Sequence, residues 1–308
     1  FINKSLVKII MSPTNNRTTT TKKTKRRLTS PVRKSKQGFF VRLLQKFPSW
    51  TWWLLIGGIV IIYLCFFYYF FVSPFGIRWR ALYGGIDNPQ GYNVRGIDIS
   101  HHQGKIDWDK LRSEGLIEDV PVRFIMVKAT EGSNLVDKCY AYNFKNARDY
   151  GYVRGAYHFW SNLSGAETQA YNFINNVELS PGDLPPVLDI EQTSNKISDN
   201  ELCDSLVKWL TIVESHYGVK PIIYTYKKFK KKHLTDSIFN SYPHWIAHYY
   251  VDSLDYSGKW HFWQHTDCGK LPGIEELVDL NIFNGSYEQL LEMTIIEPND
   301  SSETVSLE

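Results

Sequence analysis

The chain has 308 residues, 43% of them hydrophobic, with 35 Lys and Arg against 32 Asp and Glu. This composition excludes an intrinsically disordered chain and a small disulfide scaffold, and the length allows one large domain plus an appendage. Residues 1–50 hold 13 basic and no acidic side chains, which leaves 22 basic and 32 acidic residues for the remainder. The charge pattern predicts a basic tail before an acidic domain, and the acidic domain disfavours a nucleic-acid partner.

A long uncharged segment follows the basic tail, since no charged side chain occurs between Phe47 and Ile77. Its apolar part, Trp52–Val72, has 21 residues, and about 20 residues span a hydrocarbon core. A cleaved signal peptide is the alternative, but its apolar region is shorter and is followed by small residues. The basic residues precede the span, so the positive-inside rule predicts a cytoplasmic N-terminus. We expect a single-pass protein of the inner (cytoplasmic) membrane, anchored in the lipid bilayer, with its acidic domain outside the cytoplasm.

These patterns predict five segments along the chain. Residues 12–37 lack aromatic side chains and are rich in Thr, Ser and Lys, a composition that cannot bury enough surface to fold. Met11 is the first methionine and a candidate start of translation. The expected segments are a disordered cytoplasmic tail at 1–48, a transmembrane helix at 49–75, a linker at 76–94, a folded domain at 95–290 and an acidic tail at 291–308.

Eight short runs rich in Ile, Val and aromatic residues follow the linker, and this pattern is typical of buried strands. The runs are Gly96–Ser100, Phe124–Ala129, Val153–Trp160, Val187–Glu191, Pro221–Tyr226, His244–Tyr249, Trp260–His265 and Val278–Ile282. Helical patterns separate the early runs, at Trp108–Ser113, Lys138–Tyr150, Gly165–Val177 and Asp199–Tyr217. Alternating strands and helices predict an α/β fold, a TIM-like parallel (β/α) barrel with eight strands and a reduced set of helices. An open doubly wound sheet is the alternative, but no GxGxxG motif follows the first run.

Acidic residues mark several strand ends, where a barrel of this kind carries its active site. Asp98 lies in the first run, Asp189 and Glu191 in the fourth, and Asp279 in the eighth. Burying acids on an apolar strand is costly unless they are used or paired. Crowding of like charges raises some carboxyl pKa values, so that one acid stays protonated while another is ionised. Glycoside hydrolysis needs such a pair.

Aromatic side chains near the strand ends suit a sugar substrate, because their faces cover the apolar face of a pyranose. Core packing is the simpler explanation for most of them. They are Tyr157, Trp160, Tyr224, Trp245, Tyr249 and Trp263.

A metal site is the competing use of clustered acids, as in a metal-dependent glycan deacetylase. His101, His102, His158, His248 and His265 are potential ligands. They lack HExxH or other ligand spacing, so hydrogen-bonded core or loop histidines are the better explanation. We therefore expect no metal and no other cofactor. The basic run KKFKKKH at 227–233 is interpreted as a solvated helix face, with contact to anionic peptidoglycan or lipid as the alternative.

The ordered motifs together resemble glycoside hydrolase family 25, the lysozymes of the N-acetylmuramidase type. The resemblance runs from about residue 96 to residue 288. It rests on GIDISHHQGKIDW (96–108), FIMVKATEG (124–132), RGAYHFW (154–160), PPVLDIE (185–191), PIIYTY (221–226), WIAHYY (245–250), FWQHTDCGKLPGI (262–274) and VDLNIFNGS (278–286). One motif departs from the family pattern, because the segment between Gly104 and Lys128 is slightly long and contains Pro121.

The resemblance implies cleavage of the β-1,4 bond between N-acetylmuramic acid and N-acetylglucosamine in peptidoglycan. By position in the motifs, Glu191 corresponds to the general acid. Asp98, Asp189 and Asp279 correspond to the other active-site carboxylates, with Asp189 favoured for orienting the acetamido group and Asp98 for the water. The expected substrate-binding residues are Tyr157, Trp160, Tyr224, Tyr249 and Gln264. A catalytically silent peptidoglycan-binding scaffold remains an alternative, and it is disfavoured because all four acids are present.

Overall fold

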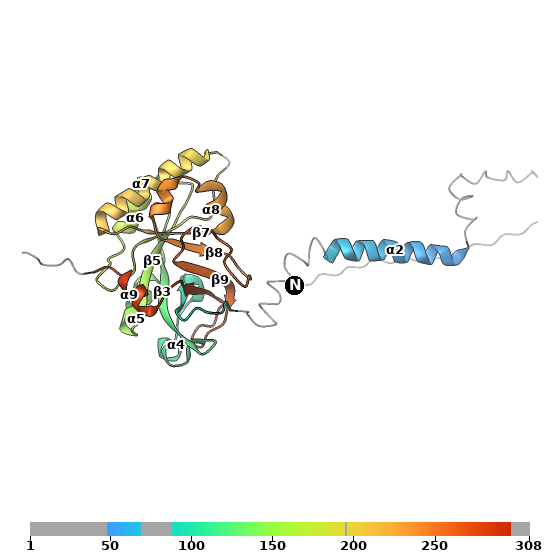
Figure 1. The fold of residues 1–308 in the computed structure, drawn as a ribbon, viewed down its shortest axis with the longest axis horizontal. Helices are drawn as coiled ribbons and strands as arrows, with labels where there is room; N and C mark the ends of the chain where they lie inside the picture. The colour runs from blue at the N-terminus through green and yellow to red at the C-terminus, as the bar shows by residue number, and fades with distance from the viewer. Residues whose placement is uncertain (1–47, 69–87, 195, 297–308) are drawn as a thin grey trace, which may run out of the picture. The chain divides into compact units, whose positions relative to one another are not determined.

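The computed structural model describes residues 48–68, 88–194 and 196–296 (Figure 1). The predicted basic tail lies outside the described residues except for Pro48. So do residues 69–87, which include most of the predicted linker, and residues 297–308 of the predicted acidic tail. Within the described residues the chain forms one apolar helix and one barrel, and each is considered separately.

Helix α2 (Ser49–Phe67) contains the predicted membrane segment. Its 19 residues correspond to a length of about 28 Å at 1.5 Å per residue, close to the thickness of a hydrocarbon core of about 30 Å. Pro48 precedes the helix and accepts a hydrogen bond from the Thr51 hydroxyl at 2.7 Å. The stretch Trp50–Phe67 is apolar on all sides and unburied, and α2 is long and apolar enough to cross a membrane. A signal sequence near the N-terminus can pass the same test of length and composition, so the helix is a candidate membrane span.

Eight strands form a closed barrel, because the first strand pairs with both the second and the last of them. In chain order they are β1 (Arg95–Ile99), β3 (Val120–Glu131), β5 (Val153–Phe159), β6 (Val187–Asp189), β7 (Ile222–Tyr226), β8 (His244–Ala247), β9 (Phe262–Gly269) and β10 (Val278–Phe283). Two short strands, β2 (Leu116–Ile117) and β4 (Leu135–Val136), pair antiparallel with the beginning and the end of β3. All eight predicted runs are therefore strands of the barrel.

The prediction of an entirely parallel barrel is wrong for β10. This strand runs antiparallel to both of its neighbours, β1 and β9, while the other barrel pairs are parallel. The reason is the short connection of residues 270–277 between β9 and β10, which contains no helix. Parallel strands need a crossover of about a dozen residues or more, whereas a short connection joins antiparallel strands.

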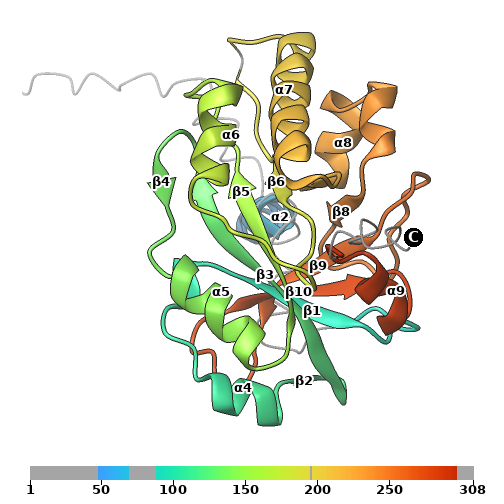
Figure 2. The same ribbon diagram turned by 90° about the vertical axis from the view of Figure 1, so that its left-hand side faces the viewer.

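Helices accompany the first strands and are absent between β8 and β9, where residues 248–261 are all described. The longest is α7 (Asp199–Tyr217), which has the predicted bounds because Ser198 and Glu201 form a capping box and Gly218 ends the helix at φ +71°. Figure 2 shows α6 and α7 packed side by side, with α5 against the sheet. The other helices are α4 (Trp108–Glu114), α5 (Tyr140–Asp149), α6 (Ala166–Ile174), α8 (Lys227–His233) and α9 (Tyr287–Glu292), with 3₁₀ turns η2 (His101–Gln103) and η3 (Ser237–Ser241).

Side chains alternate between the two faces of each strand, which gives the domain two main packed layers. Ile97, Ile125 and Ile223 belong to a cluster that includes helix residues such as Trp209. Phe124, Met126, Trp245 and Phe262 belong to a second cluster made largely of strand residues, in the barrel interior. The interior is therefore filled with apolar side chains below the rim at which the parallel strands end.

Candidate active site

The predicted acids lie at one rim of the barrel. Asp98 is near the end of β1, Asp189 is the last residue of β6, and Glu191 follows two residues later. Asp279 is the second residue of β10, directly opposite Asp98 in the antiparallel register. Because β10 runs in the opposite direction, its beginning lies at the rim where the other strands end. The reversed strand thus adds an acid to the same rim.

Asp98 is held by a network of amide hydrogen bonds. Its Oδ2 accepts from Gln264 Nε2 at 2.8 Å and from Asn281 Nδ2 at 2.7 Å. The Asn281 side chain is oriented in turn, because its Oδ1 accepts from the Trp245 indole N–H at 2.8 Å. The Asp98 side chain is 6% exposed. Two amide donors on one buried oxygen favour the ionised form of that carboxyl.

Gln264 connects Asp98 to two tyrosines. The hydroxyls of Tyr224 and Tyr249 donate to Gln264 Oε1 at 2.6 Å and 2.7 Å. These bonds occupy both lone pairs of the amide oxygen and leave its N–H₂ group for Asp98. The amide therefore has one orientation, and Asp98 on β1 has a fixed position relative to β7 and β9, which are not its neighbours in the sheet.

Asp98 and Asp279 share a proton. A side-chain hydrogen bond joins the two carboxyl groups, and burial raises the pKa of both. The pKa of Asp279 rises to about 9, first through burial and then through the charge of Asp98. Because the amides stabilise the charge on Asp98, the proton at neutral pH belongs to Asp279, which donates it to Asp98.

Asp189 and Glu191 have fewer partners. Asp189 Oδ1 is buried and has no hydrogen-bond partner among the described residues. Burial raises its pKa well above the usual range, the charge of Glu191 raises it further, and the charge of Lys128 opposes both. Burial also raises the pKa of Glu191, and a hydrogen bond with Tyr224 lowers it by less. Lys128 itself forms an ion pair with Glu131, with 2.7 Å between Nζ and Oε2. The raised pKa values keep a proton available at this side of the rim.

The aromatic residues predicted to bind substrate divide between the two faces of the barrel. Tyr224 is buried and Tyr157 is half-buried in the interior, and desolvation together with the charge of Asp189 raises the pKa of both hydroxyls. Tyr249 packs against the same interior cluster. Trp160 instead packs in the helix-facing cluster, and its backbone N–H donates to the Asp189 carbonyl at 2.8 Å. Trp160 therefore contacts the backbone next to the acids rather than the interior tyrosines.

The predicted alternative of a histidine metal site finds no geometric support in the described residues. His158 points to the helix side, where it contacts Thr130 Oγ1 at 2.7 Å and Gln169 Oε1 at 3.2 Å and stacks on Trp209. Burial lowers the pKa of His158 to about 4, so the ring is neutral. The His101 Nδ1 atom lies 2.7 Å from Asp137 Oδ2, within hydrogen-bonding distance. No group of three potential ligands was found in the parts of the chain that the structure describes.

Two residues of the site were missed from sequence. Asn281 and Lys128 take part in the electrostatics of the acids, yet neither was predicted as a site residue. The available signal for Asn281 was an amide within the apolar strand VDLNIF, because a buried polar group needs a partner. Lys128 lies within the motif FIMVKATEG at 124–132, and no local pattern indicates its role.

Comparison with known proteins identifies the family. The sequence matches the family described as glycosyl hydrolases family 25 over residues 97–274. The chain belongs to this family. Among solved structures, a family 25 glycosyl hydrolase from Bacillus anthracis is 35% identical, covers 68% of this chain and 97% of that chain, and has a TM-score of 0.61. A bacterial lysozyme from Streptomyces coelicolor is 32% identical, with coverage of 67% and 98% and the same TM-score of 0.61.

The curated relatives include an uncharacterized protein and a lysozyme. The uncharacterized protein YegX of Escherichia coli strain K12 is 43% identical over 206 residues, covering 66% of this chain and 74% of that protein. Lysozyme M1 of Streptomyces globisporus is 34% identical over 221 residues, covering 64% of this chain and 70% of that protein. The family match at residues 97–274 contains Asp98, Asp189 and Glu191, whereas Asp279 lies just beyond it.

Proposed function

We propose that this family 25 protein is a peptidoglycan hydrolase that cleaves the β-1,4 bond between N-acetylmuramic acid and N-acetylglucosamine. The observation that carries the proposal is the group of four acids at one barrel rim, all with raised pKa values. Similarity to Lysozyme M1 and to the solved bacterial lysozyme supports the substrate class. Glycosidic cleavage needs one protonated and one ionised carboxyl group, and a rim of this composition supplies both.

Glu191 is the general acid in this proposal. Its pKa is raised by burial, so the carboxyl keeps a proton that it transfers to the departing N-acetylglucosamine oxygen. Its position two residues beyond the end of β6 leaves it less enclosed than Asp189. Asp189, with one unpartnered buried oxygen, accepts the N–H of the substrate's acetamido group. This hydrogen bond would satisfy an oxygen that otherwise remains desolvated.

Asp98 carries the negative charge that assists at the anomeric centre. Its two amide donors stabilise the carboxylate, and the Asp279 proton completes its partners. In this arrangement Asp98 activates water, and Asp279 keeps Asp98 in position. No step requires a metal ion or another cofactor, because the proton donor and the carboxylate both belong to the chain.

The substrate-binding residues extend from this charged centre. Tyr157, Tyr224 and Tyr249 contribute aromatic surface and hydroxyl groups near the sugar, and Gln264 orients both the tyrosines and Asp98. Trp160 supports the Asp189 backbone through its own N–H. The ring of Tyr249 also borders a neighbouring pocket, so this residue marks the edge of the sugar site.

A digestion experiment tests the proposed activity. The full chain, solubilised in detergent, is incubated with purified peptidoglycan, and soluble fragments and new reducing ends are measured. The wild-type chain should release both, whereas the Asp189→Asn variant should release them much more slowly. A wild-type chain that sediments with peptidoglycan but releases no fragment would favour a glycan-binding scaffold. Release of acetate without new reducing ends would favour a deacetylase.

We further propose that α2 anchors this enzyme in the inner membrane. The supporting features are the apolar helix and the basic residues before it, which predict a cytoplasmic N-terminus. The proposed organisation has a cytoplasmic tail at 1–48, a membrane helix at 49–75, a linker at 76–94, the hydrolase at 95–290 and an acidic tail at 291–308. The hydrolase then faces the periplasm or cell wall.

Protease added to spheroplasts tests this topology. The domain at 95–290 should be degraded while an N-terminal fragment containing residues 1–48 stays protected. A protected hydrolase domain, or a mature protein that begins after residue 72, would contradict the anchor.

A further inference from the structure

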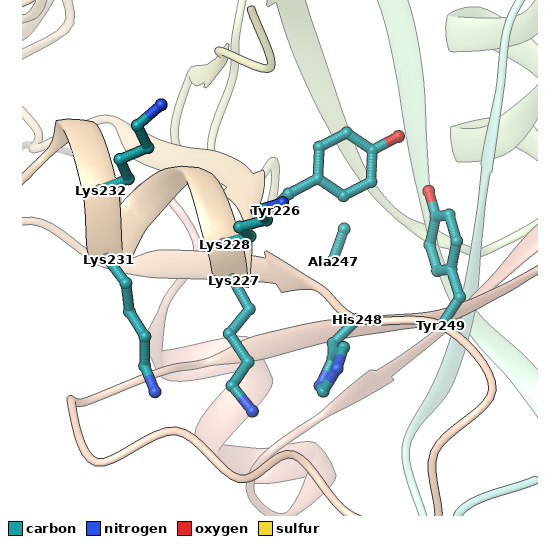
Figure 3. Close-up of a pocket in the computed structure, with 8 residues that line it drawn as sticks. All are labelled: Tyr226, Lys227, Lys228, Lys231, Lys232, Ala247, His248 and Tyr249. Atoms are coloured by element: carbon teal, nitrogen blue, oxygen red, sulfur yellow. The ribbon is translucent and has the colours of Figure 1, made fainter. Parts of the chain in front are cut away.

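A lysine-lined pocket lies beside the carboxylate rim. It has a volume of about 630 Å³, within the range of about 300–1,000 Å³ that small-molecule sites occupy. Helix α8 follows β7 directly, and residues 248 and 249 follow β8 directly, so the pocket is at the rim where these parallel strands end. Its charged and polar lining comes from Lys227, Lys228, Lys231, Lys232, His248 and Tyr249 (Figure 3).

Two tyrosines connect this pocket with the acids. Tyr249 lines the pocket and donates to Gln264 at 2.7 Å, and Gln264 donates to Asp98 at 2.8 Å. Tyr226 lines the pocket as well and packs edge-on against Tyr249, with ring centroids 5.8 Å apart. Burial, and then the charge of Glu191, raises the pKa of the Tyr226 hydroxyl. The pocket is therefore connected to Asp98 through Tyr249 and Gln264.

The charge of the pocket is opposite to that of the domain around it. Helix α8 contains no acidic residue. Lys227 lies 3.5 Å from Asp255, but Lys228, Lys231 and Lys232 are exposed and form no ion pair within the described residues. His248 Nδ1 is buried and has no hydrogen-bond partner there. The inner surface of the pocket is mainly apolar, and the lysine ammonium groups around it provide positive charge for an anionic group.

The lysines spread around the pocket rather than forming one row. Lys227 and Lys231 extend from α8 to the side on which His248 lies, whereas Lys232 extends the other way (Figure 3). A ligand that meets several of these amines needs several separated anionic groups. A concave pocket next to the reacting centre also suits a flexible branch of the substrate better than a flat lipid surface, which needs a projecting basic face.

We propose that this pocket binds the carboxylates of the stem peptide that peptidoglycan carries on N-acetylmuramic acid. The inference rests on the proposed muramidase function. In that reaction the attacked C1 belongs to the muramic acid, and the peptide begins at the lactyl group on C3 of the same sugar. The peptide therefore leaves the glycan chain within one sugar ring of the acids, where the pocket opens. Its free carboxylates are separated along the peptide and match the spread of the lysines. The enzyme then prefers glycan that still carries peptides.

Matched substrates test this preference. Glycan chains of the same length are prepared with their stem peptides and after an amidase has removed them, and kcat/KM is measured on both with the full chain in detergent. The wild-type ratio should favour peptide-bearing glycan by about tenfold or more, mainly through KM. The preference should weaken as salt concentration rises, because salt screens exposed charges. In the Lys228→Gln/Lys231→Gln/Lys232→Gln variant the ratio should fall by about tenfold.

Two further variants separate charge from folding. Lys228→Arg/Lys231→Arg/Lys232→Arg keeps the charge and should keep the preference. The control Lys110→Gln/Lys138→Gln/Lys259→Gln removes three exposed lysines outside the pocket and should leave the ratio at the wild-type value. A glutamine variant of the pocket that loses the same factor on both substrates, or on neither, would overturn the inference.

Failure of this inference is distinguishable from failure of the proposed function. If the wild-type chain cleaves both substrates equally, the muramidase stands and the peptide pocket does not. If it cleaves neither, the proposed function fails. A vesicle experiment provides the remaining outcome: if the glutamine variant keeps the substrate ratio but loses sedimentation with vesicles that contain phosphatidylglycerol, the lysines bind lipid and the inference is wrong.

Discussion

The two pairs of acids at the barrel rim differ in how they are held. Asp98 and Asp279 face each other across antiparallel strands, and two amides bind the Asp98 oxygen. Asp189 and Glu191 lie at and beyond the end of β6, and one Asp189 oxygen has no partner among the described residues. In the proposed mechanism the first pair holds the negative charge, whereas the second supplies a proton and an open acceptor. Acid–base catalysis needs both, and the barrel separates them by strand.

Substituting the proton donor should have the largest effect. Glu191→Gln keeps the shape of the side chain but removes the transferable proton, so turnover of peptidoglycan should fall by about 10²–10⁴. Substrate binding should survive, and a synthetic substrate with a good leaving group should be affected less because its oxygen needs less protonation. Glu178→Gln, at an exposed position, is the matched control. Near-normal turnover of Glu191→Gln would contradict its assigned role.

Substituting the fixed charge should have a smaller effect of a different kind. Asp98→Asn presents an amide to the Gln264 and Asn281 donors and removes the carboxylate, so turnover should fall by about 10². The loss should be equal for natural and activated substrates, since assistance at the anomeric centre does not depend on the leaving group. A loss confined to the natural substrate would mean that the roles of the two pairs are exchanged.

The shared proton predicts a pH-dependent change in stability. The pKa of Asp279 is about 9 in the folded chain and 3.8 is the ordinary value, so the folded state binds this proton more tightly than the unfolded state. Stability is therefore lost as pH rises between these values. Asp279→Asn removes that loss and keeps an N–H donor for Asp98. At pH 8 its Tm should exceed that of the wild type by about 2–4 °C, corresponding to about 1 kcal/mol.

Convergence at low pH provides the control for this prediction. Near pH 3 Asp279 is protonated in the folded chain and largely protonated in the unfolded chain, so the two Tm values should approach each other. Asp252→Asn, at an exposed position, should follow the wild type throughout. A constant difference across the pH range would mean that the proton is not shared as described.

Chelation should have no effect. Both pairs act through carboxyl groups alone, so the rate with EDTA should equal the rate without it. Loss of activity that Zn²⁺ or Mg²⁺ restores would replace the two-pair account with a metal-dependent one.

Sequence patterns predicted most of the domain because the relevant signals are local. The capping box of Ser198 and Glu201 and the terminal Gly218 determine the bounds of α7. The direction of β10 was not predictable in the same way, since VDLNIF reads as a strand in either direction and only its pairing decides. Asp279 still lies at the rim with the other acids, because the first residues of the reversed strand β10 lie where the parallel strands end.

The hydrogen bonds between side chains of the site were harder to predict than the positions of its acids. Asp189 and Glu191 were found from their spacing at a strand end, which is a property of one segment. The bonds of Asn281 and Gln264 to Asp98 join residues far apart in sequence, and no local pattern identifies such partners. Trp160 is a different case, because it directly follows β5 and the side-chain alternation of that strand directs it to the helices. Its expected contact with the sugar rested on its chemistry alone.

Cleavage on the muramic acid side leaves muramic acid at the new reducing end, so the identity of that sugar tests the proposed activity most directly. Peptidoglycan digested with the full chain is reduced with borohydride, hydrolysed and analysed by mass spectrometry. The two-pair account predicts that the reduced sugar is muramicitol, and that it is nearly absent from the Glu191→Gln digest. Glucosaminitol as the reduced sugar, or no reduced sugar at all from the wild-type chain, would contradict the account.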